Sequence, residues 1–147
     1  MTYIGIDPGK SGALAILDAS GAVQVLLPFD EQKARDALYW AAEEGRAVCC
    51  LERVGARPGQ GVTSMFSFGT NYGFWQGLLA AFEIPFQLVT PAVWKKAFGV
   101  TADKNSSVEV CHRLFPAADL RRTERSIKQD DGLAEALLLA EYARRHF

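Results

Sequence analysis

The stretch TYIGIDPGKSG, residues 2–12, decides the fold, because an apolar strand pattern in it runs directly into a carboxylate and a tight turn. Residues 2–7 alternate and end at Asp7, which predicts a strand closed by an acid. Residues 8–12 are Pro, Gly, Lys, Ser and Gly, a composition typical of a turn, since Pro fixes φ and Gly adopts unusual backbone angles. We therefore expect a buried strand that presents a carboxylate at its carboxyl end.

Two further strands are predicted immediately after this turn. Residues 13–17 are apolar, a short Ser-Gly turn follows, and residues 23–27 form the third strand. Strands joined by such short turns form an antiparallel meander. A helical pattern over 31–44 then leads to the continuous apolar run 48–51, which ends at Glu52. Such a run is typical of a strand buried on both faces of a sheet.

The second half of the chain predicts one more strand and four helices. The strand is expected at 86–89, and the helices are expected at 63–82, 92–98, 103–114 and 131–147. A meander followed by alternating strands and helices predicts an α/β fold in which helices flank a five-stranded mixed sheet. With 147 residues and no linker or low-complexity tract, we expect a single domain over 1–147.

Composition argues against several classes of protein. About half of the residues are hydrophobic, which is enough for a core and too many for a disordered chain. No run approaches the roughly 18–20 apolar residues of a membrane helix, and the start lacks a basic signal-peptide region, so we expect a cytoplasmic protein without a membrane partner. Three cysteines without CxxC spacing predict buried thiols rather than disulfides or a zinc site. The net charge of −1 counts against a DNA-binding protein, which usually has a surplus of basic residues. This argument does not hold if basic residues gather on one face or if bound cations offset the carboxylates.

The acidic residues stand at positions that a sheet would bring together. Asp7 and Glu52 each end a buried strand, and the carboxyl ends of parallel strands meet at one edge of a sheet. Asp131 and Glu135 are four residues apart, so they share one face of the last helix. Asp130 is the alternative partner of Glu135, and an acid at this helix start is also favoured as a cap.

Such a group of carboxylates predicts a metal site. Carboxylates in one place repel one another unless cations neutralise them. Ligands that are all oxygen select Mg²⁺ or Mn²⁺ over zinc. Two such ions about 3.5–4 Å apart form the clamp used for in-line attack on phosphodiesters. The alternative is that the acids are ordinary surface charges.

Four segments also resemble a known family, the RuvC-type Holliday-junction resolvases of the RNase H-like superfamily. They are IGIDPG at 4–9 with Ser11-Gly12, Leu51-Glu52, the Gly-rich and aromatic stretch 61–73, and DGLAEAL at 131–137. The three acidic motifs occur in the family's order, and the stretch 61–73 looks like that of the phage and related bacterial branch. The resemblance spans nearly the whole chain and implies an RNase H-like fold.

The resemblance implies a crossover junction endodeoxyribonuclease with a part in DNA recombination or repair. Members are homodimers that bind four-way branched DNA and nick two symmetry-related strands, leaving 5′-phosphate and 3′-hydroxyl ends. By resemblance, Asp7, Glu52, Asp131 and Glu135 would hold two cations in each active site, and Lys104 would approach the scissile phosphate. Well-known bacterial members carry two aspartates three residues apart on the last helix, whereas Asp131 and Glu135 are four apart here.

Other side chains are candidates for contacts with DNA or with a second copy of the chain. The candidate DNA contacts are Arg57, Phe66, Phe68, Lys95 and Lys96. In a resolvase the aromatic rings would wedge into the junction, but aromatic residues at helical spacing are more often core or dimer interface. The basic residues would grip phosphates or are solvated charges, and the net positive run 121–128 would add to them. Phe74 and Trp75 are candidate dimer contacts.

Three other functions fit parts of the sequence. The loop after the first strand also resembles the phosphate loop of actin-like and sugar-kinase ATPases, but those proteins need a second lobe, and no GxxxxGK[ST] motif is present, so no nucleotide cofactor is expected. An RNase H-like nuclease acting on flaps or hybrids is the second. A non-catalytic nucleic-acid-binding domain is the third, and it predicts that the acids are dispensable.

Overall fold

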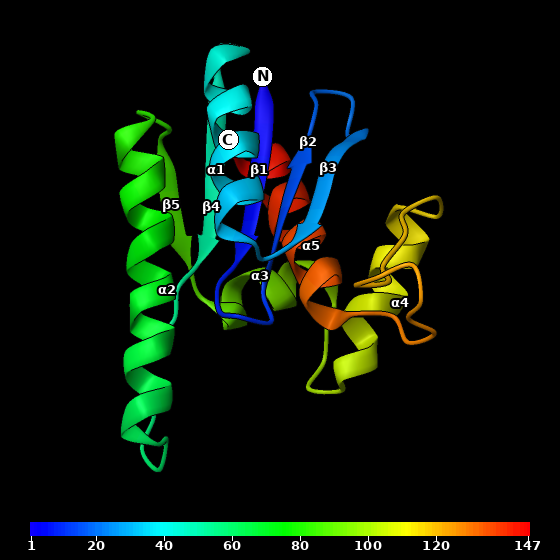
Figure 1. The fold of residues 1–147 in the computed structure, drawn as a ribbon. Helices are drawn as coiled ribbons and strands as arrows, with labels where there is room; N and C mark the ends of the chain where they lie inside the picture. The colour runs from blue at the N-terminus through cyan, green and yellow to red at the C-terminus, as the bar shows by residue number, and fades with distance from the viewer.

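The computed structural model describes residues 1–147 and contains one mixed sheet of five strands (Figure 1). The strands are β1 (Thr2–Asp7), β2 (Ala13–Leu17), β3 (Val23–Pro28), β4 (Ala47–Glu52) and β5 (Phe86–Val89). They lie in the order β3-β2-β1-β4-β5. The meander β1-β2-β3 is antiparallel, whereas β1, β4 and β5 run parallel to one another. The predicted α/β class and the predicted mixed five-stranded sheet are confirmed.

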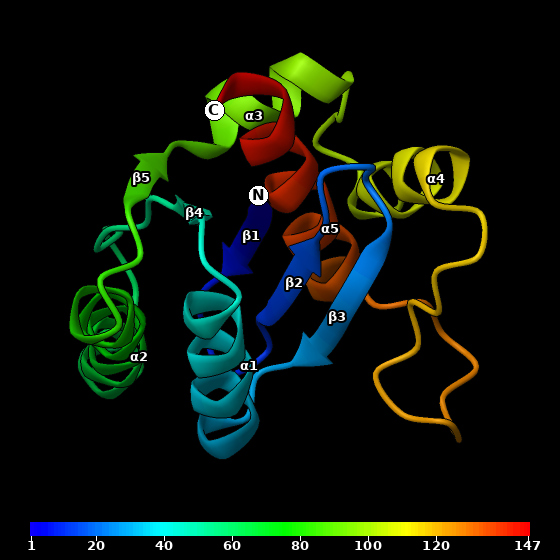
Figure 2. The same ribbon diagram turned by 90° about the horizontal axis from the view of Figure 1, so that it is seen from above.

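Five helices cover the two faces of the sheet (Figure 1, Figure 2). They are α1 (Glu31–Glu43), α2 (Val62–Ala81), α3 (Pro91–Phe98), α4 (Lys104–Leu114) and α5 (Asp131–His146). Helices α1 and α2 lie on one face, and α3, α4 and α5 lie on the other. The predicted order of elements is confirmed, and each predicted boundary lies within one residue of the observed one.

Alternation along the strands decides toward which face the acids point. Ile6 on β1 packs in the core beneath α1 and α2, whereas Cys50 on β4 packs in the core beneath α3 and α5. Successive side chains of a strand point to opposite faces. Asp7 follows Ile6 directly, and Glu52 lies two residues after Cys50, so both carboxylates belong to the face that α5 covers.

Gly5 allows α5 to lie directly against β1. A Cβ atom at Gly5 would overlap the backbone of Ala136 and Ala140 on that helix. Only a residue without a side chain permits this approach, which carries the start of α5 to the carboxyl end of β1. The packing of Gly5 therefore sets how close Glu135 lies to Asp7.

Gly5→Ala is expected to lower the free energy of unfolding by about 1–3 kcal/mol, because the added methyl group must displace α5. Gly69→Ala on α2 is the matched control, since a Cβ there meets no atom within 4 Å. That substitution is expected to raise the free energy of unfolding by about 0.5–1 kcal/mol, the usual gain from Gly to Ala in a helix. Urea denaturation of both variants measures the difference. A Gly5→Ala protein as stable as the wild type would contradict the close packing.

The aromatic residues of α2 divide between the core and the surface. Trp75 is fully buried and packs edge-to-face on Phe29, with ring centroids 5.5 Å apart, and on Phe74 at 5.7 Å. The prediction that Trp75 is a dimer contact is therefore wrong, because this side chain has no exposed surface to offer. Val62 and Phe66, in contrast, are 84% and 79% exposed.

The three cysteines are buried thiols, as predicted, and none is in a disulfide. Burial raises the pKa of Cys50 and of Cys111 to about 12, so both remain protonated at neutral pH. None of the helices combines the length and the apolar character that crossing a membrane requires.

Candidate metal centre

Three carboxylates from distant parts of the chain meet at the carboxyl end of the sheet. Asp7 ends β1, Glu52 ends β4, and Glu135 lies near the start of α5. One carboxylate oxygen from each of them lies within 4.8 Å of the other two. Parallel pairing of β1 with β4 places the first two acids at one edge, and the approach of α5 over Gly5 adds the third. A set of oxygen donors at this spacing fits a divalent cation such as Mg²⁺ or Mn²⁺.

Burial and mutual repulsion raise the pKa of these acids. Burial is the main reason that the pKa of Asp7 lies well above its ordinary value, and the carboxylates of Glu135, Glu52 and Asp131 raise it further. Burial is also the largest influence on Glu52 and Glu135, whose pKa values are raised as well. Clustered carboxylates with little access to water carry an electrostatic cost that a divalent cation relieves.

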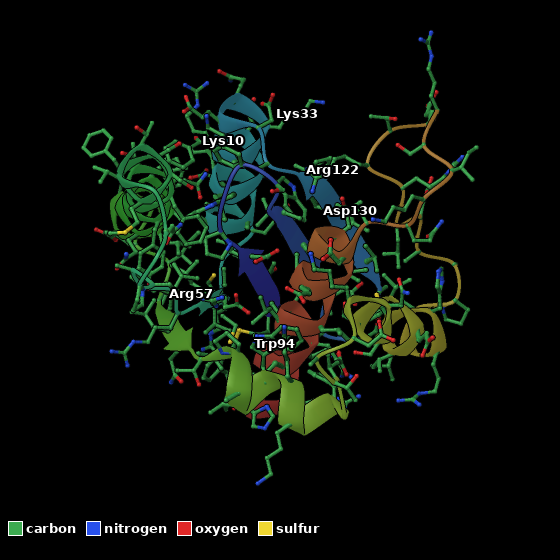
Figure 3. All side chains as sticks on the ribbon, turned by 90° about the horizontal axis from the view of Figure 1, so that it is seen from below. Lys10, Lys33, Arg57, Trp94, Arg122 and Asp130 are labelled. Atoms are coloured by element: carbon green, nitrogen blue, oxygen red, sulfur yellow. The ribbon has the colours of Figure 1, made fainter.

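Helix α3 supplies two neighbouring side chains to this cluster. The Nε1–H group of Trp94 donates a hydrogen bond of 2.7 Å to Oε2 of Glu52. The ammonium nitrogen of Lys95 lies 3.3 Å from Oε1 of Glu135. The positive charge of Lys95 lowers the pKa of Asp7, Glu52 and Glu135. The cluster of carboxylates is thus already stabilised by one neighbouring cation. Figure 3 shows Trp94 projecting from α3 toward α5.

Asp130 and Asp131, the two alternatives for the fourth acid, have different surroundings. Asp130 caps α5, accepting the backbone N–H of Leu133 at 3.0 Å, and pairs with Arg122 at 2.8 Å (Figure 3). Asp131 is exposed in the first turn of α5, and its charge raises the pKa of Asp7 and of Glu135. Asp130 is therefore engaged in capping, whereas Asp131 is electrostatically coupled to the cluster, although it is not among the three acids that converge.

Comparison with known proteins shows similarity in structure. No protein-family model and no curated protein matches the sequence. RuvC of T. thermophilus in complex with Holliday junction substrate is 16% identical, with a TM-score of 0.65 over 99% of this chain and 97% of that one. The chain has the RuvC-type RNase H-like fold. A second Thermus thermophilus RuvC structure is 17% identical, with a TM-score of 0.60 over 99% and 96% of the two chains. The yeast mitochondrial Holliday junction resolvase Ydc2 is 16% identical, with a TM-score of 0.51 over 97% and 77%.

The basic residues predicted from the sequence differ in their relation to the carboxylates of this RuvC-type fold. Lys95 pairs with a carboxylate of the cluster, and Arg57 lies close enough to lower the pKa of Glu52. Lys96 is exposed on α3, and Lys104 is exposed as the first residue of α4. Neither of these two lysines forms an ion pair with a carboxylate of the cluster. Their roles, including the catalytic role of Lys104, stay predictions.

Basic residues lie near the acids at the carboxyl end of the sheet, in a chain with a net charge of −1. Lys10, Arg57 and Arg122 come from three different loops at this end (Figure 3). Arg122 is anchored there, because it donates to the backbone carbonyl of Ser11 at 2.5 Å and pairs with Asp130. Lys10 and Arg57 therefore add positive charge near the carboxylates, whereas the charge of Arg122 is paired with Asp130.

The two phenylalanines considered as junction wedges have unequal access to solvent. The ring of Phe66 is exposed near the start of α2. Phe68 packs against the loop that follows β1, where a Cβ atom added to Gly9 would lie 2.9 Å from the ring. Both stay predicted DNA contacts, and Phe66 is the one whose face is available for stacking on a base.

Two side chains that contact the carboxylate cluster or the loop beside it were missed in the sequence. Asn71 on α2 accepts the backbone N–H of Gly9 at 2.6 Å and so fixes the loop directly after Asp7. An amide among the aromatic residues of a largely apolar helix is a signal for such a role, because buried polar groups need partners. Trp94 gave no comparable signal, since Glu52 lies 42 residues away along the chain.

Proposed function

We propose that this chain is a metal-dependent DNA endonuclease that resolves four-way junctions by paired nicks, leaving 5′-phosphate and 3′-hydroxyl ends. The observation that carries the proposal is the convergence of Asp7, Glu52 and Glu135 at the carboxyl end of the sheet. The shared fold adds support, because the Thermus thermophilus RuvC with this fold is bound to Holliday junction substrate. Residues 1–147 would act as a single nuclease domain.

These acids would hold two divalent cations. Asp7, Glu52 and Glu135 offer only oxygen ligands, and Asp131 is the acid best placed by its charge to complete the set. Lys95 already stands beside the carboxylates as a positive charge. When bound, Mg²⁺ or Mn²⁺ would lower the pKa of the attacking water and stabilise negative charge on the leaving 3′ oxygen.

The chain's own residues would bind and orient the DNA around this centre. When divalent cations bind the carboxylates, Lys95 would leave Glu135 and contact a backbone phosphate of the DNA instead. Arg57 and Arg122 border the same end of the sheet and would hold neighbouring phosphates (Figure 3). These contacts fix register without reading sequence, which suits selection of a DNA structure rather than of a base sequence.

A homodimer would present two such centres to the two strands of a junction. Val62 and Phe66 are exposed apolar side chains one helical turn apart on α2, and they would contribute to the contact between the two copies or to contact with DNA. Size-exclusion chromatography with light scattering measures the oligomeric state directly, and we expect a dimer. A monomer at all concentrations would contradict this part of the proposal.

Cleavage of defined substrates tests the proposed function. A synthetic four-way junction, a flap and an RNA/DNA hybrid of matched length are incubated with the protein, with and without Mg²⁺. We expect paired nicks in the four-way junction only, and only with Mg²⁺. Cutting confined to the flap or to the hybrid would indicate an RNase H-like nuclease with another substrate. Binding without cutting of any substrate would indicate a non-catalytic domain.

A further inference from the structure

Trp94 is the side chain that fixes the orientation of Glu52. Its indole is fully buried, and its Nε1–H group donates a 2.7 Å hydrogen bond to Oε2 of Glu52, which is itself only 8% exposed. We propose that Trp94 is a positioning residue, which holds the Glu52 carboxylate ready for a divalent cation and stays in place when the cation binds. This inference rests on the function proposed above.

The surroundings of Trp94 make it a rigid donor. The ring packs in the core cluster that joins α3, α4 and α5, together with Phe98, Val110 and Leu138. Helix α3 is itself held at both ends, by Pro91 in its first turn and by the left-handed Gly99 after its last residue. A donor that cannot move imposes its geometry on the flexible side chain that accepts from it.

Pre-orientation of Glu52 lowers the cost of cation binding. A glutamate side chain has three rotatable bonds, and a ligand that is fixed in advance loses less conformational freedom on binding. A carboxylate has about four lone-pair sites, so it can accept from the indole and still bind a cation. Hydrogen-bond partners of metal ligands act in this way in many metal sites.

Lys95 and Trp94, the two α3 side chains beside the carboxylates, would therefore have different roles. Lys95 is a charged partner of Glu135, and an incoming cation competes with it for the same carboxylate. Trp94 is a neutral donor, so it adds no charge that a cation must displace. Trp94 can consequently remain bonded to Glu52 in both the free and the loaded protein.

Trp75 offers a matched control. It is also fully buried, but its Nε1 atom has no hydrogen-bond partner, and it packs on the opposite face of the sheet among α1 and α2. Replacement by Phe at either position removes one indole N–H and keeps an aromatic ring. Only Trp94→Phe takes a donor away from Glu52.

Calorimetric titration with Mn²⁺ alone tests the proposal. Trp94→Phe is expected to weaken Mn²⁺ binding about tenfold or more relative to the wild type, the usual effect of losing a partner of a metal ligand, whereas Trp75→Phe binds as the wild type does. Wild-type affinity in Trp94→Phe would overturn the role of Trp94 and leave the proposed function standing. A wild-type protein that binds no Mn²⁺ would overturn both.

Two further readouts separate positioning from a general structural role. In steady-state cleavage of the junction, Trp94→Phe is expected to need about tenfold more Mn²⁺ for half-maximal kcat, with an unchanged KM for DNA. A raised KM at every Mn²⁺ concentration would overturn the proposal. In Trp40→Phe/Trp75→Phe protein, which retains Trp94 alone, paramagnetic Mn²⁺ is expected to quench the indole fluorescence as it binds. Binding by calorimetry without quenching would place the cation away from Trp94 and overturn it as well.

Discussion

Asp7→Asn is expected to reduce the rate of four-way-junction cleavage by about 10³-fold or more, which corresponds to about 4 kcal/mol of transition-state stabilisation. Asp7 contributes one of the three converging carboxylates and is the only one of them on β1, the central strand of the sheet. An amide has nearly the same shape but no negative charge, so the fold is retained while the cation loses its ligand. Single-turnover cleavage at saturating Mg²⁺ measures the rate.

Asp36→Asn is the control for this experiment. Asp36 is an exposed acid on α1, and its only cationic partner is the exposed neighbour Arg35 at 3.4 Å. Surface ion pairs of this kind contribute little, so we expect wild-type cleavage from this variant. Cleavage by Asp7→Asn at a rate near that of Asp36→Asn would show that the cluster is not the site of chemistry.

Asp7→Asn is also expected to stabilise the metal-free protein at neutral pH. The pKa of Asp7 is raised in the folded state by burial and by its acidic neighbours, above the ordinary value of 3.8. The contribution of such a group to stability is full below its unfolded pKa and is lost as the pH rises from there through the raised folded value. The free energy of unfolding of metal-free Asp7→Asn should therefore exceed that of the metal-free wild type at pH 7.

The advantage of Asp7→Asn should disappear on acidification below about pH 3, where Asp7 is protonated in the folded state and mostly protonated in the unfolded state as well. Carboxyl groups with a lowered pKa, such as Asp119 at about 2 beside Arg121, contribute less to the free energy of unfolding in acid. This loss is the same in the wild type and in Asp7→Asn. Thermal unfolding in EDTA across this pH range measures the difference. Saturating Mg²⁺ should reverse the order at pH 7, because only the wild type gains binding energy. A wild type that is more stable than Asp7→Asn in EDTA at pH 7 would contradict the electrostatic strain.

Much of the architecture could be predicted because local pattern and turn chemistry agree along this chain. The run into Asp7, the turn after it and the apolar run into Glu52 specify two strands and their ends. The parallel pairing of β1 with β4, on which the convergence of the two acids depended, is supplied by the structure and brings them to one edge.

The parts of the site that escaped prediction depend on contacts between distant residues. The spacing of the last helix left Asp130 and Asp131 open, and only the pairing of Asp130 with Arg122 shows which of them is engaged in capping. Lys95 and Lys104 were both candidate phosphate contacts, but the pairing of Lys95 with Glu135 could not be predicted, because the two residues lie on different helices. Trp75 looked like a candidate for an interface because helical spacing alone does not show which face of α2 meets the sheet.

Anomalous diffraction from crystals soaked in Mn²⁺ would locate the cations directly. We expect Mn²⁺ at about 2 Å from carboxylate oxygens of Asp7, Glu52 and Glu135, with Lys95 withdrawn from Glu135. An ordered Mn²⁺ bound only elsewhere, or a cluster that keeps its Lys95 contact and holds no Mn²⁺, would show that these acids do not form a metal centre.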